Sequence, residues 1–207
     1  MIPIDFKGRA KRLDAWDFGR LGRLLLLGED ELRAVVEVEC SGSGFDAQGR
    51  PKMLFEPHVF WRELGEAKRK LAETQGLAYP RWGTKPYPAD SYPRLERAIK
   101  IDRPAALRAA SWGLGQILGA NHKAAGYASA EAMVAAFCED EEVHLEAMVR
   151  FILSEHLDDE LRRHDWSAFA RGYNGPKYAA HGYHTRLAAA HAKWAKRPDT
   201  PVPAGAS

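Results

Sequence analysis

The second half of the chain is a succession of segments in which apolar residues recur at helical spacing. Between residues 95 and 194 these segments follow one another with only short breaks. Pro104 suits the first turn of one helix, and Ser129 suits the capping position of another. This pattern predicts a mainly helical domain. We expect helices over residues 95–101, 104–110, 129–137, 141–157, 165–171 and 175–194.

The first half of the chain combines two more expected helices with one short strand. The helices cover residues 13–27 and 30–40, and a stretch rich in Gly and Ser, residues 41–51, follows the second. Residues 53–61 are rich in large apolar and aromatic side chains, which predicts a strand or hairpin arm, and Pro57 favours a sheet edge or a bulge over a central strand. The predicted fold class is mainly α (α+β), with one small β hairpin.

Length and charge limit the possible functions. The 207 residues favour one domain, and the formal net charge of +2 does not require a nucleic-acid partner. The longest apolar run, Leu24–Leu27, is far too short to span a bilayer, so we expect no stable membrane insertion. No secretory signal follows the basic N-terminus, which predicts synthesis in the cytoplasm. We expect a monomer, with a domain over residues 1–196 and a loose, Pro-rich tail over 197–207.

Glu39 is the first candidate for chemistry. It falls at the C-terminal end of an expected helix among valines, and both the apolar setting and the helix dipole raise the pKa of a carboxyl. A carboxyl that stays protonated near neutral pH is able to donate a proton to the leaving oxygen of a sugar. The alternative is a solvated carboxyl at a helix end, as we expect for Glu37.

Glu56 is the second candidate carboxyl, in the segment after the expected strand. It would position water or stabilise an oxocarbenium-like transition state, with His58 as its orienting partner, or it would form a structural ion pair. The proline-rich stretch 78–93 that follows contains Trp82 and Tyr87. Loops of this length in compact domains are usually functional.

Two short segments carry candidate binding residues. In SWGLGQILG, residues 111–119, the glycines predict a tight turn that lets the backbone approach a ligand, with Trp112 and Gln116 as stacking and hydrogen-bonding groups. The spacing does not match a dinucleotide fingerprint. In YNGPKY, residues 173–178, Tyr173 and Asn174 precede a turn and are candidates for a groove wall.

The remaining polar clusters suggest no cofactor. His181 and His184 have the spacing of a helical metal pair, but no acidic partner is obvious, so we expect no metal. The acidic run 139–142 predicts a solvated helix start, and the basic residues between 7 and 12 a solvated arm. Cys40 and Cys138 are expected to be inert buried thiols.

Taken together, four segments resemble the N-acetylmuramidase family of phage and prophage endolysins, a branch of the lysozyme-like superfamily. They are EVECSGSGF, GRPKMLFEPHVFWREL, AALRAASWGLGQILGANHKAAGY and DWSAFARGYNGPKY, within roughly residues 10 to 195. The resemblance implies a lysozyme-like helical domain with the β hairpin beside an active-site cleft, and no cofactor. Cys40 departs from the serine that we expect after the catalytic Glu.

The resemblance also implies an activity and a set of site residues. It implies cleavage of the β-1,4 bond between N-acetylmuramic acid and N-acetylglucosamine in peptidoglycan, with Glu39 as general acid and Glu56 as a second carboxyl. It implies action on the cell wall, in the periplasm, after release from the cytoplasm. The residues expected to bind the glycan are Ser111, Trp112, Gln116, Tyr173, Asn174, Trp82 and Tyr87.

Two alternatives remain open at this point. A lytic transglycosylase breaks the same bond with one carboxyl and an internal sugar hydroxyl in place of water. A non-catalytic module that binds peptidoglycan, or a phage structural part, would keep the fold without the chemistry.

Overall fold

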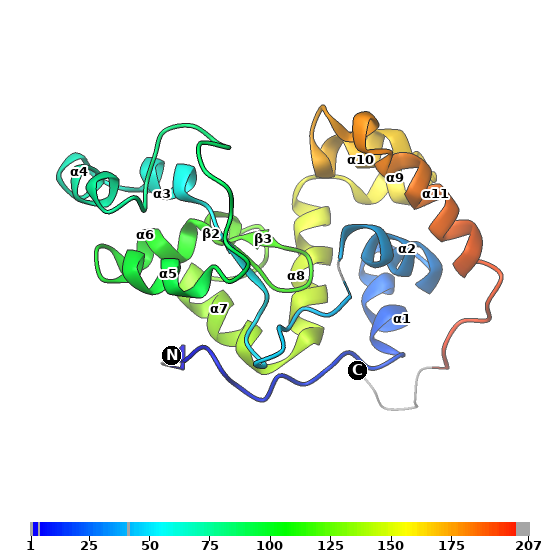
Figure 1. The fold of residues 1–207 in the computed structure, drawn as a ribbon. Coiled ribbons are helices and arrows are strands. Elements are labelled where there is room, and N and C mark those ends of the chain that lie inside the picture. Colours follow the sequence, from blue (N-terminus) through cyan, green and yellow to red (C-terminus); the bar gives the residue numbers. More distant parts are fainter. Residues whose placement is uncertain (1, 4, 41, 202–207) are drawn as a thin grey trace.

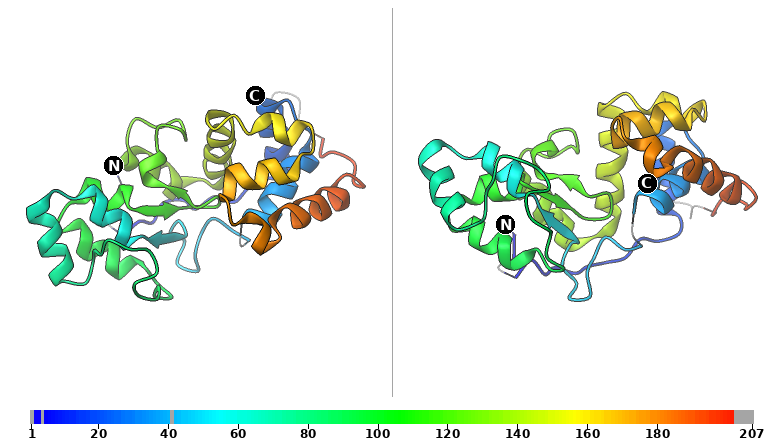
Figure 2. Two further views of the ribbon diagram at one scale, coloured as in Figure 1. Left: turned by 90° about the horizontal axis from the view of Figure 1, so that it is seen from above. Right: turned by 45° about the horizontal axis from the view of Figure 1, so that its top comes forward.

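A long central helix separates two groups of elements in the computed structural model (Figure 1), which describes residues 2–3, 5–40 and 42–201. The central helix is α8, Glu141–Ser154. On one side lies what we call the helical lobe, residues 13–40 and 158–194; on the other lies the sheet lobe, residues 45–139 (Figures 1 and 2). The mainly α architecture expected from the sequence is confirmed.

The helical lobe is built around α2, Glu29–Glu39, which agrees closely with the second expected helix. The first expected helix is broken: α1 covers Asp17–Gly22, a 3-10 turn follows, and Leu26 adopts a left-handed conformation with φ of +56°. A non-glycine residue rarely adopts this conformation, and it ends the helix. The lobe is completed by α9 (Asp158–Arg162), α10 (Trp166–Asn174) and α11 (Tyr183–Trp194), of which α11 packs along α2.

The sheet lobe contains three antiparallel strands in the order β1-β2-β3. Strand β1 (Met53–Phe55) pairs with β2 (Ala110–Trp112), so that Leu54 lies opposite Ser111, and β2 pairs with β3 (Ile117–Leu118). The glycine-rich turn predicted after Trp112 joins β2 to β3. The small hairpin therefore lies at β2–β3 and not over residues 53–61, where the sequence placed it, and β1 adds a strand that is distant in sequence.

The strand expected over residues 53–61 is wrong beyond Phe55. Pro57 opens α3, Pro57–Glu63, with Glu56 at the preceding capping position. Proline fits the first turn of a helix because its fixed φ is helical and because an N–H there has no helical partner. The lobe also contains α4 (Glu66–Thr74), which we did not expect, together with α5 (Tyr92–Ile99), α6 (Arg103–Arg108) and α7 (Ala130–Glu139).

Two of the expected helix starts in the second half, at Pro104 and Ser129, are confirmed, whereas the helix expected over residues 175–194 begins only at Tyr183, after a 3-10 turn over Tyr178–His181. The Ser129 side chain accepts a hydrogen bond from the Ala132 amide at 3.1 Å, and Pro104 lies in the first turn of α6. Such caps satisfy amides that have no partner inside the helix. None of the helices in the described ranges is both long and apolar enough to cross a membrane.

The acidic run 139–142 is not a solvated helix start, because Glu141 is 4% exposed. Its carboxylate accepts hydrogen bonds from the Gly44 amide, from the Ser43 hydroxyl at 3.0 Å and from the Leu13 amide at 3.2 Å. Arg12 lies 3.5 Å from the same carboxylate. The start of α8 thus binds both the N-terminal segment and the loop that follows α2.

The basic arm is likewise held to the protein. The Lys11 amide donates to the Glu139 carbonyl at 3.0 Å, and the Arg9 side chain bonds the Glu139 carboxylate at 3.0 Å. At the other end, Thr200 bonds Glu29 through its amide at 2.7 Å and its hydroxyl at 2.8 Å. That part of the expected tail contacts α2, and residues 202–207 lie outside the described residues.

Replacing Glu141 by glutamine should destabilise the fold by about 3 kcal/mol, because a buried carboxylate that serves several donors loses its charge and part of its hydrogen bonding. Urea unfolding measures the loss. Glu146→Gln is the matched control on the same helix: Glu146 pairs with Arg150 at 2.6 Å in a partly exposed position, and its loss should cost less than about 0.5 kcal/mol. Equal losses would contradict the role given to Glu141.

Candidate active site

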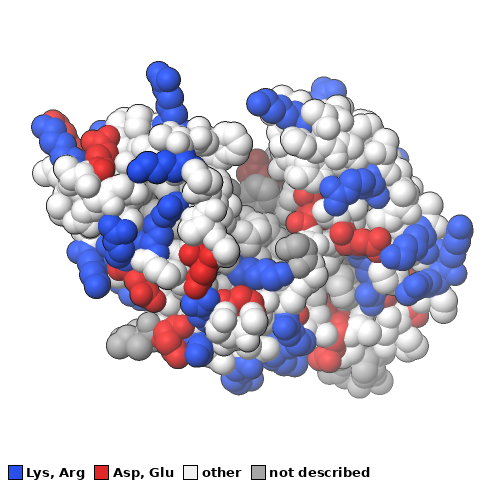
Figure 3. Space-filling model, viewed as in Figure 1, with Lys and Arg blue, Asp and Glu red and all other residues white. Residues whose placement is uncertain are grey.

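A deep hollow separates the two lobes on the face shown in Figure 3. The C-terminal ends of α2 and α10 lie on the side of the helical lobe that faces the sheet lobe (Figures 1 and 2). Glu39 is the last residue of α2, and Asn174 is the last residue of α10. The fold therefore brings together two residues that are far apart in the sequence, on the side of the helical lobe that faces the sheet lobe.

Glu39 is partly buried, and its carboxylate has a defined partner. The Asn174 side-chain amide donates a hydrogen bond to Oε1 of Glu39 at 2.9 Å. The guanidinium of Arg186 on α11 bonds the carbonyl of Val38, the preceding residue, at 3.1 Å. Glu39 is thus held by one neutral donor, with a positive charge nearby that does not pair with it directly.

These surroundings set the proton affinity of Glu39. Burial raises the pKa of Glu39 above its ordinary value, while the hydrogen bond from Asn174 and the positive charge of Arg186 act in the opposite direction. The net shift is upward, because desolvation of the charged form outweighs a neutral donor and a more distant cation. The carboxyl is therefore suited to hold a proton at higher pH than a solvated glutamate.

Tyr173 lies beside Glu39 but serves mainly as packing. Its ring stacks on Phe169 at 5.4 Å and meets Phe151 edge to face at 5.9 Å. Its hydroxyl is buried without a hydrogen-bond partner among the described residues, and burial raises the pKa of Tyr173. The Tyr173 ring packs against the core, so most of the ring surface is not available to a ligand.

The turn between β2 and β3 packs directly on α8. Gly113 has a φ of +69°, and a Cβ on Gly115 would lie 2.2 Å from Met148. The sequence predicted that the backbone at these glycines approaches a ligand. In the structure it approaches the central helix α8 instead. Gln116 is exposed beyond the turn, where its side-chain amide donates to the Gly113 carbonyl at 2.9 Å.

Gln116 also lines a hollow of about 490 Å³ between the loop before β1 and the segment before α5. Polar side chains dominate this hollow, among them Arg50, Lys52 and Asp90. Ser111 is half-buried in the middle of β2. The sheet lobe thus presents a polar surface with hydrogen-bonding groups, which suits a hydroxyl-rich ligand.

The stacking role expected for Trp112 is wrong. Its side chain is 0% exposed, its indole N–H donates to the Leu107 carbonyl at 3.1 Å, and its ring lies against Phe6 at 5.9 Å. A side chain enclosed in the core has no face to offer a sugar. Trp112 points into the core because side chains along a strand alternate between the two faces of the sheet.

Glu56 lies in the other lobe from Glu39 and is bound to the aromatic loop. The Tyr87 hydroxyl donates to Oε2 of Glu56, and Nδ1 of His58 lies 3.5 Å from the same oxygen. His58 is thus placed as the expected partner, and burial lowers its pKa. Trp82, in the same loop, is 71% exposed and free to meet a ligand.

Cys40 is the inert thiol that was expected. It is 9% exposed, its sulfur lies 4.0 Å from the sulfur of Met148, and burial raises its pKa to about 12. Cys138 is fully buried as well, and burial also raises its pKa to about 12. Both thiols stay protonated at neutral pH, so neither acts as a nucleophile.

The histidine pair does not come together as a ligand set. His181 contacts the ring of Tyr183 at 6.0 Å, and His184 contacts that of Tyr178 at 5.4 Å. His191 turns instead toward the start of α2, where its Nε2 lies 3.2 Å from Asp30.

Sequence reasoning missed three residues that support the site from other elements. Glu141 binds the loop after α2, His144 accepts a hydrogen bond from the Leu114 amide in the β2–β3 turn, and Arg186 lies near Glu39. They act across the fold and carry no local sequence signal.

A mainly helical fold with a small sheet lobe, and a partly buried carboxyl with a raised pKa at a helix end on the side that faces that lobe, fits the class of lysozyme-like glycoside hydrolases. The comparisons with known proteins agree. The family model for N-acetylmuramidase matches residues 29–195. The chain therefore belongs to the N-acetylmuramidase family and is a hydrolase of peptidoglycan.

One solved structure is similar over most of this chain. It is the crystal structure of the Burkholderia AP3 phage endolysin, which is 36% identical, with a TM-score of 0.84. The match covers 90% of this chain and 73% of that one. No curated protein matches.

Replacing Glu39 by glutamine should stabilise the protein at pH 7. The folded-state pKa is raised, so between the unfolded value of about 4.3 and the folded value the folded state binds more protons, and the free energy of unfolding falls as the pH rises. The gain should disappear near about pH 4. Urea unfolding at both pH values measures it.

Glu37→Gln is the matched control, on the exposed face of α2. The hydrogen bond from Lys193 lowers the pKa of Glu37, so this variant should lose stability at pH 7. Equal pH dependence of the two variants would show that Glu39 is not in the environment described.

Proposed function

We propose that this chain cleaves the β-1,4 bond between N-acetylmuramic acid and N-acetylglucosamine, with Glu39 as the general acid. The observation that carries the proposal is the raised pKa of the Glu39 carboxyl on the side of the helical lobe that faces the sheet lobe, with Asn174 as its hydrogen-bond donor. Family membership supports the reaction, and the position of Glu39 supports the residue.

In the proposed reaction, protonated Glu39 donates its proton to the glycosidic oxygen as the bond to the anomeric carbon breaks. Positive charge develops on the sugar ring as the bond breaks, and a water molecule then adds to the anomeric carbon and releases one proton, which restores the protonated enzyme. The Glu39 carboxylate left behind is stabilised by the Asn174 amide and by the charge of Arg186. Both groups favour the ionised form, so they lower the cost of giving up the proton, while burial favours the protonated form beforehand.

Glu56 is proposed as a positioning residue for the aromatic loop. Its Oε2 already accepts from Tyr87 and lies close to His58. These contacts tie residues 78–91 to the start of α3, where Trp82 would stack on a sugar ring. The earlier alternative, in which Glu56 holds the attacking water, requires that its other oxygen face the substrate.

The sugar chain is proposed to bind across both lobes. Asn174 lines the helical side, while Gln116, Ser111 and the aromatic loop with Tyr87 line the sheet side. Their amide and hydroxyl groups match the hydroxyls and N-acetyl groups of the glycan. The similar Burkholderia phage protein is named an endolysin, and this chain is proposed to be one as well. It is proposed to be made in the cytoplasm and to reach the cell wall after release.

Glu39→Gln should lower the rate of clearing of purified cell walls by about 10²- to 10⁴-fold, the range that general acid catalysis supplies. Binding to the same walls in a sedimentation assay should be unchanged, because glutamine keeps the shape of the side chain. Glu37→Gln, two residues away on α2, is the control and should clear walls like the parent. Full clearing by Glu39→Gln would refute the assignment.

Mass spectrometry of the released muropeptides identifies which glycosidic bond is cut and whether water or a sugar hydroxyl attacks the anomeric carbon. Reducing N-acetylmuramic acid ends are expected. Anhydro ends would show the lytic transglycosylase reaction with the same acid. Products with reducing N-acetylglucosamine would show that a different bond is cut and that the proposed activity is wrong.

Glu56→Gln and Tyr87→Phe should both lower the clearing rate by less than about tenfold, below the range of a general acid or base. Both should make the loop over residues 78–91 more sensitive to limited proteolysis, because Tyr87→Phe removes this hydrogen bond and Glu56→Gln replaces a charged acceptor by a weaker, neutral one. If Glu56→Gln costs as much activity as Glu39→Gln while Tyr87→Phe does not, Glu56 takes part in the chemistry.

A further inference from the structure

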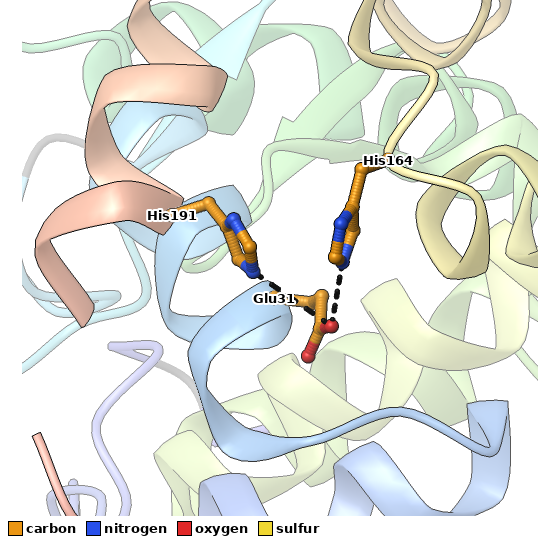
Figure 4. Close-up of side chains that lie close together, drawn as sticks. All are labelled: Glu31, His164 and His191. Carbon is orange, nitrogen blue, oxygen red and sulfur yellow. Dashed lines mark hydrogen bonds and ion pairs between the residues drawn. The ribbon is translucent and has the colours of Figure 1, made fainter. Parts of the chain in front are cut away.

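A second cluster of titratable side chains lies at the start of α2, far from Glu39. Glu31 on α2, His164 in the turn between α9 and α10, and His191 on α11 point toward one another (Figure 4). One ligand atom from each lies within 4.8 Å of the others. Glu31 precedes Glu39 by two helical turns, about 12 Å along the axis, so this cluster is separate from the candidate active site.

The distances within the cluster suit a small transition-metal ion. Oε1 of Glu31 lies 2.9 Å from Nε2 of His164 and 3.8 Å from Nε2 of His191. Zinc–ligand bonds of about 2.0–2.1 Å in a tetrahedron place ligand atoms about 3.3–3.4 Å apart, between these two distances. Only small side-chain shifts would be needed to equalise them.

Asp30 lies beside these three residues and is the candidate for a fourth ligand. Its Oδ2 lies 3.2 Å from Nε2 of His191, close to the tetrahedral spacing. Two imidazoles and two carboxylates form a ligand set that Zn²⁺ accepts, and the two negative charges balance the charge of the ion. Four protein ligands would leave no open position, which is the pattern of a structural site.

The two imidazoles are already oriented for binding. The Trp166 ring stacks on His164 at 5.3 Å, with the planes 6° apart, and lies 5.2 Å from the ring of His191. Both histidines turn Nε2 toward Glu31 (Figure 4). The Trp166 ring therefore packs against both imidazoles and restricts how far either ring can turn.

The two carboxylates of the cluster also favour a bound cation. The Glu31 side chain is 12% exposed, and its Oε2 is buried without a hydrogen-bond partner among the described residues. The Asp30 carboxyl interacts directly with that of Glu31. Adjacent carboxylates with limited access to water are costly unless protons or a metal ion neutralise them.

We propose that Asp30, Glu31, His164 and His191 form a binding site for a divalent ion of the Zn²⁺ type. The bound ion would join α11 and the α9–α10 turn to the start of α2, the helix that ends at Glu39. The site stabilises the helical lobe and takes no part in the cleavage of the glycan.

The full chain, treated with a chelator and dialysed, is titrated with ZnCl₂ in a calorimeter. One equivalent should bind, with Kd below about 1 µM. His164→Gln and His191→Gln should each weaken binding by at least about tenfold. His181→Gln, which changes an exposed histidine outside the cluster, should bind Zn²⁺ like the parent.

Thermal unfolding gives a second readout. Excess Zn²⁺ should raise the Tm of the parent and of His181→Gln, because a ligand that binds only the folded state stabilises it. The Tm of His164→Gln and of His191→Gln should not rise. Absence of binding to the parent, or equal binding by the parent and both cluster variants, would overturn the proposal and leave an ordinary hydrogen-bonded cluster.

Discussion

The first two turns of α8 hold both walls of the hollow in place. Glu141 binds the loop that leaves α2 through Gly44 and Ser43. One turn further, Nδ1 of His144 accepts a hydrogen bond from the Leu114 amide at 3.2 Å, while Nε2 meets the Phe137 carbonyl at 2.8 Å. One buried helix thus fixes the chain that follows Glu39 and the turn that carries Gln116.

The chemistry of these two anchors suits that role. Burial lowers the pKa of His144 to about 4, so the ring is neutral at working pH and acts as one donor and one acceptor. Glu141 serves several donors at once, including two backbone amides. Because unsatisfied polar groups in the core are costly, these contacts specify how the loop and the turn sit against α8.

The site itself depends on a balance of opposing effects at Glu39. Burial disfavours its charged form, and the end of α2 adds the negative end of the helix dipole. Asn174 and Arg186 favour the charged form. A carboxyl that must release a proton and later regain it needs both influences, and here they come from three different helices. The proposed metal site would hold two of those helices, α2 and α11, together at the other end of the lobe.

The sequence predicted much of the helical framework and one part of the site. Helical periodicity, Pro104 and Ser129 located α6 and α7, and the valines around residue 36 located α2 with Glu39 at its end. Local signals suffice there because caps and periodicity act within one element. The prediction of a strand after Phe55 was wrong, because Pro57 fits both a strand edge and a helix start.

What the sequence alone determined is therefore local: which segments are helical, where a helix ends on a carboxyl among apolar residues, and which family the motifs resemble. The tertiary structure decided which side chains meet. Trp112 is buried in the core. Asn174 donates a hydrogen bond to Glu39, and Tyr87 donates one to Glu56. His191 lies near Glu31 and not near the histidines that precede it in the sequence. These outcomes depend on contacts between residues distant in the chain, and no local pattern encodes such contacts.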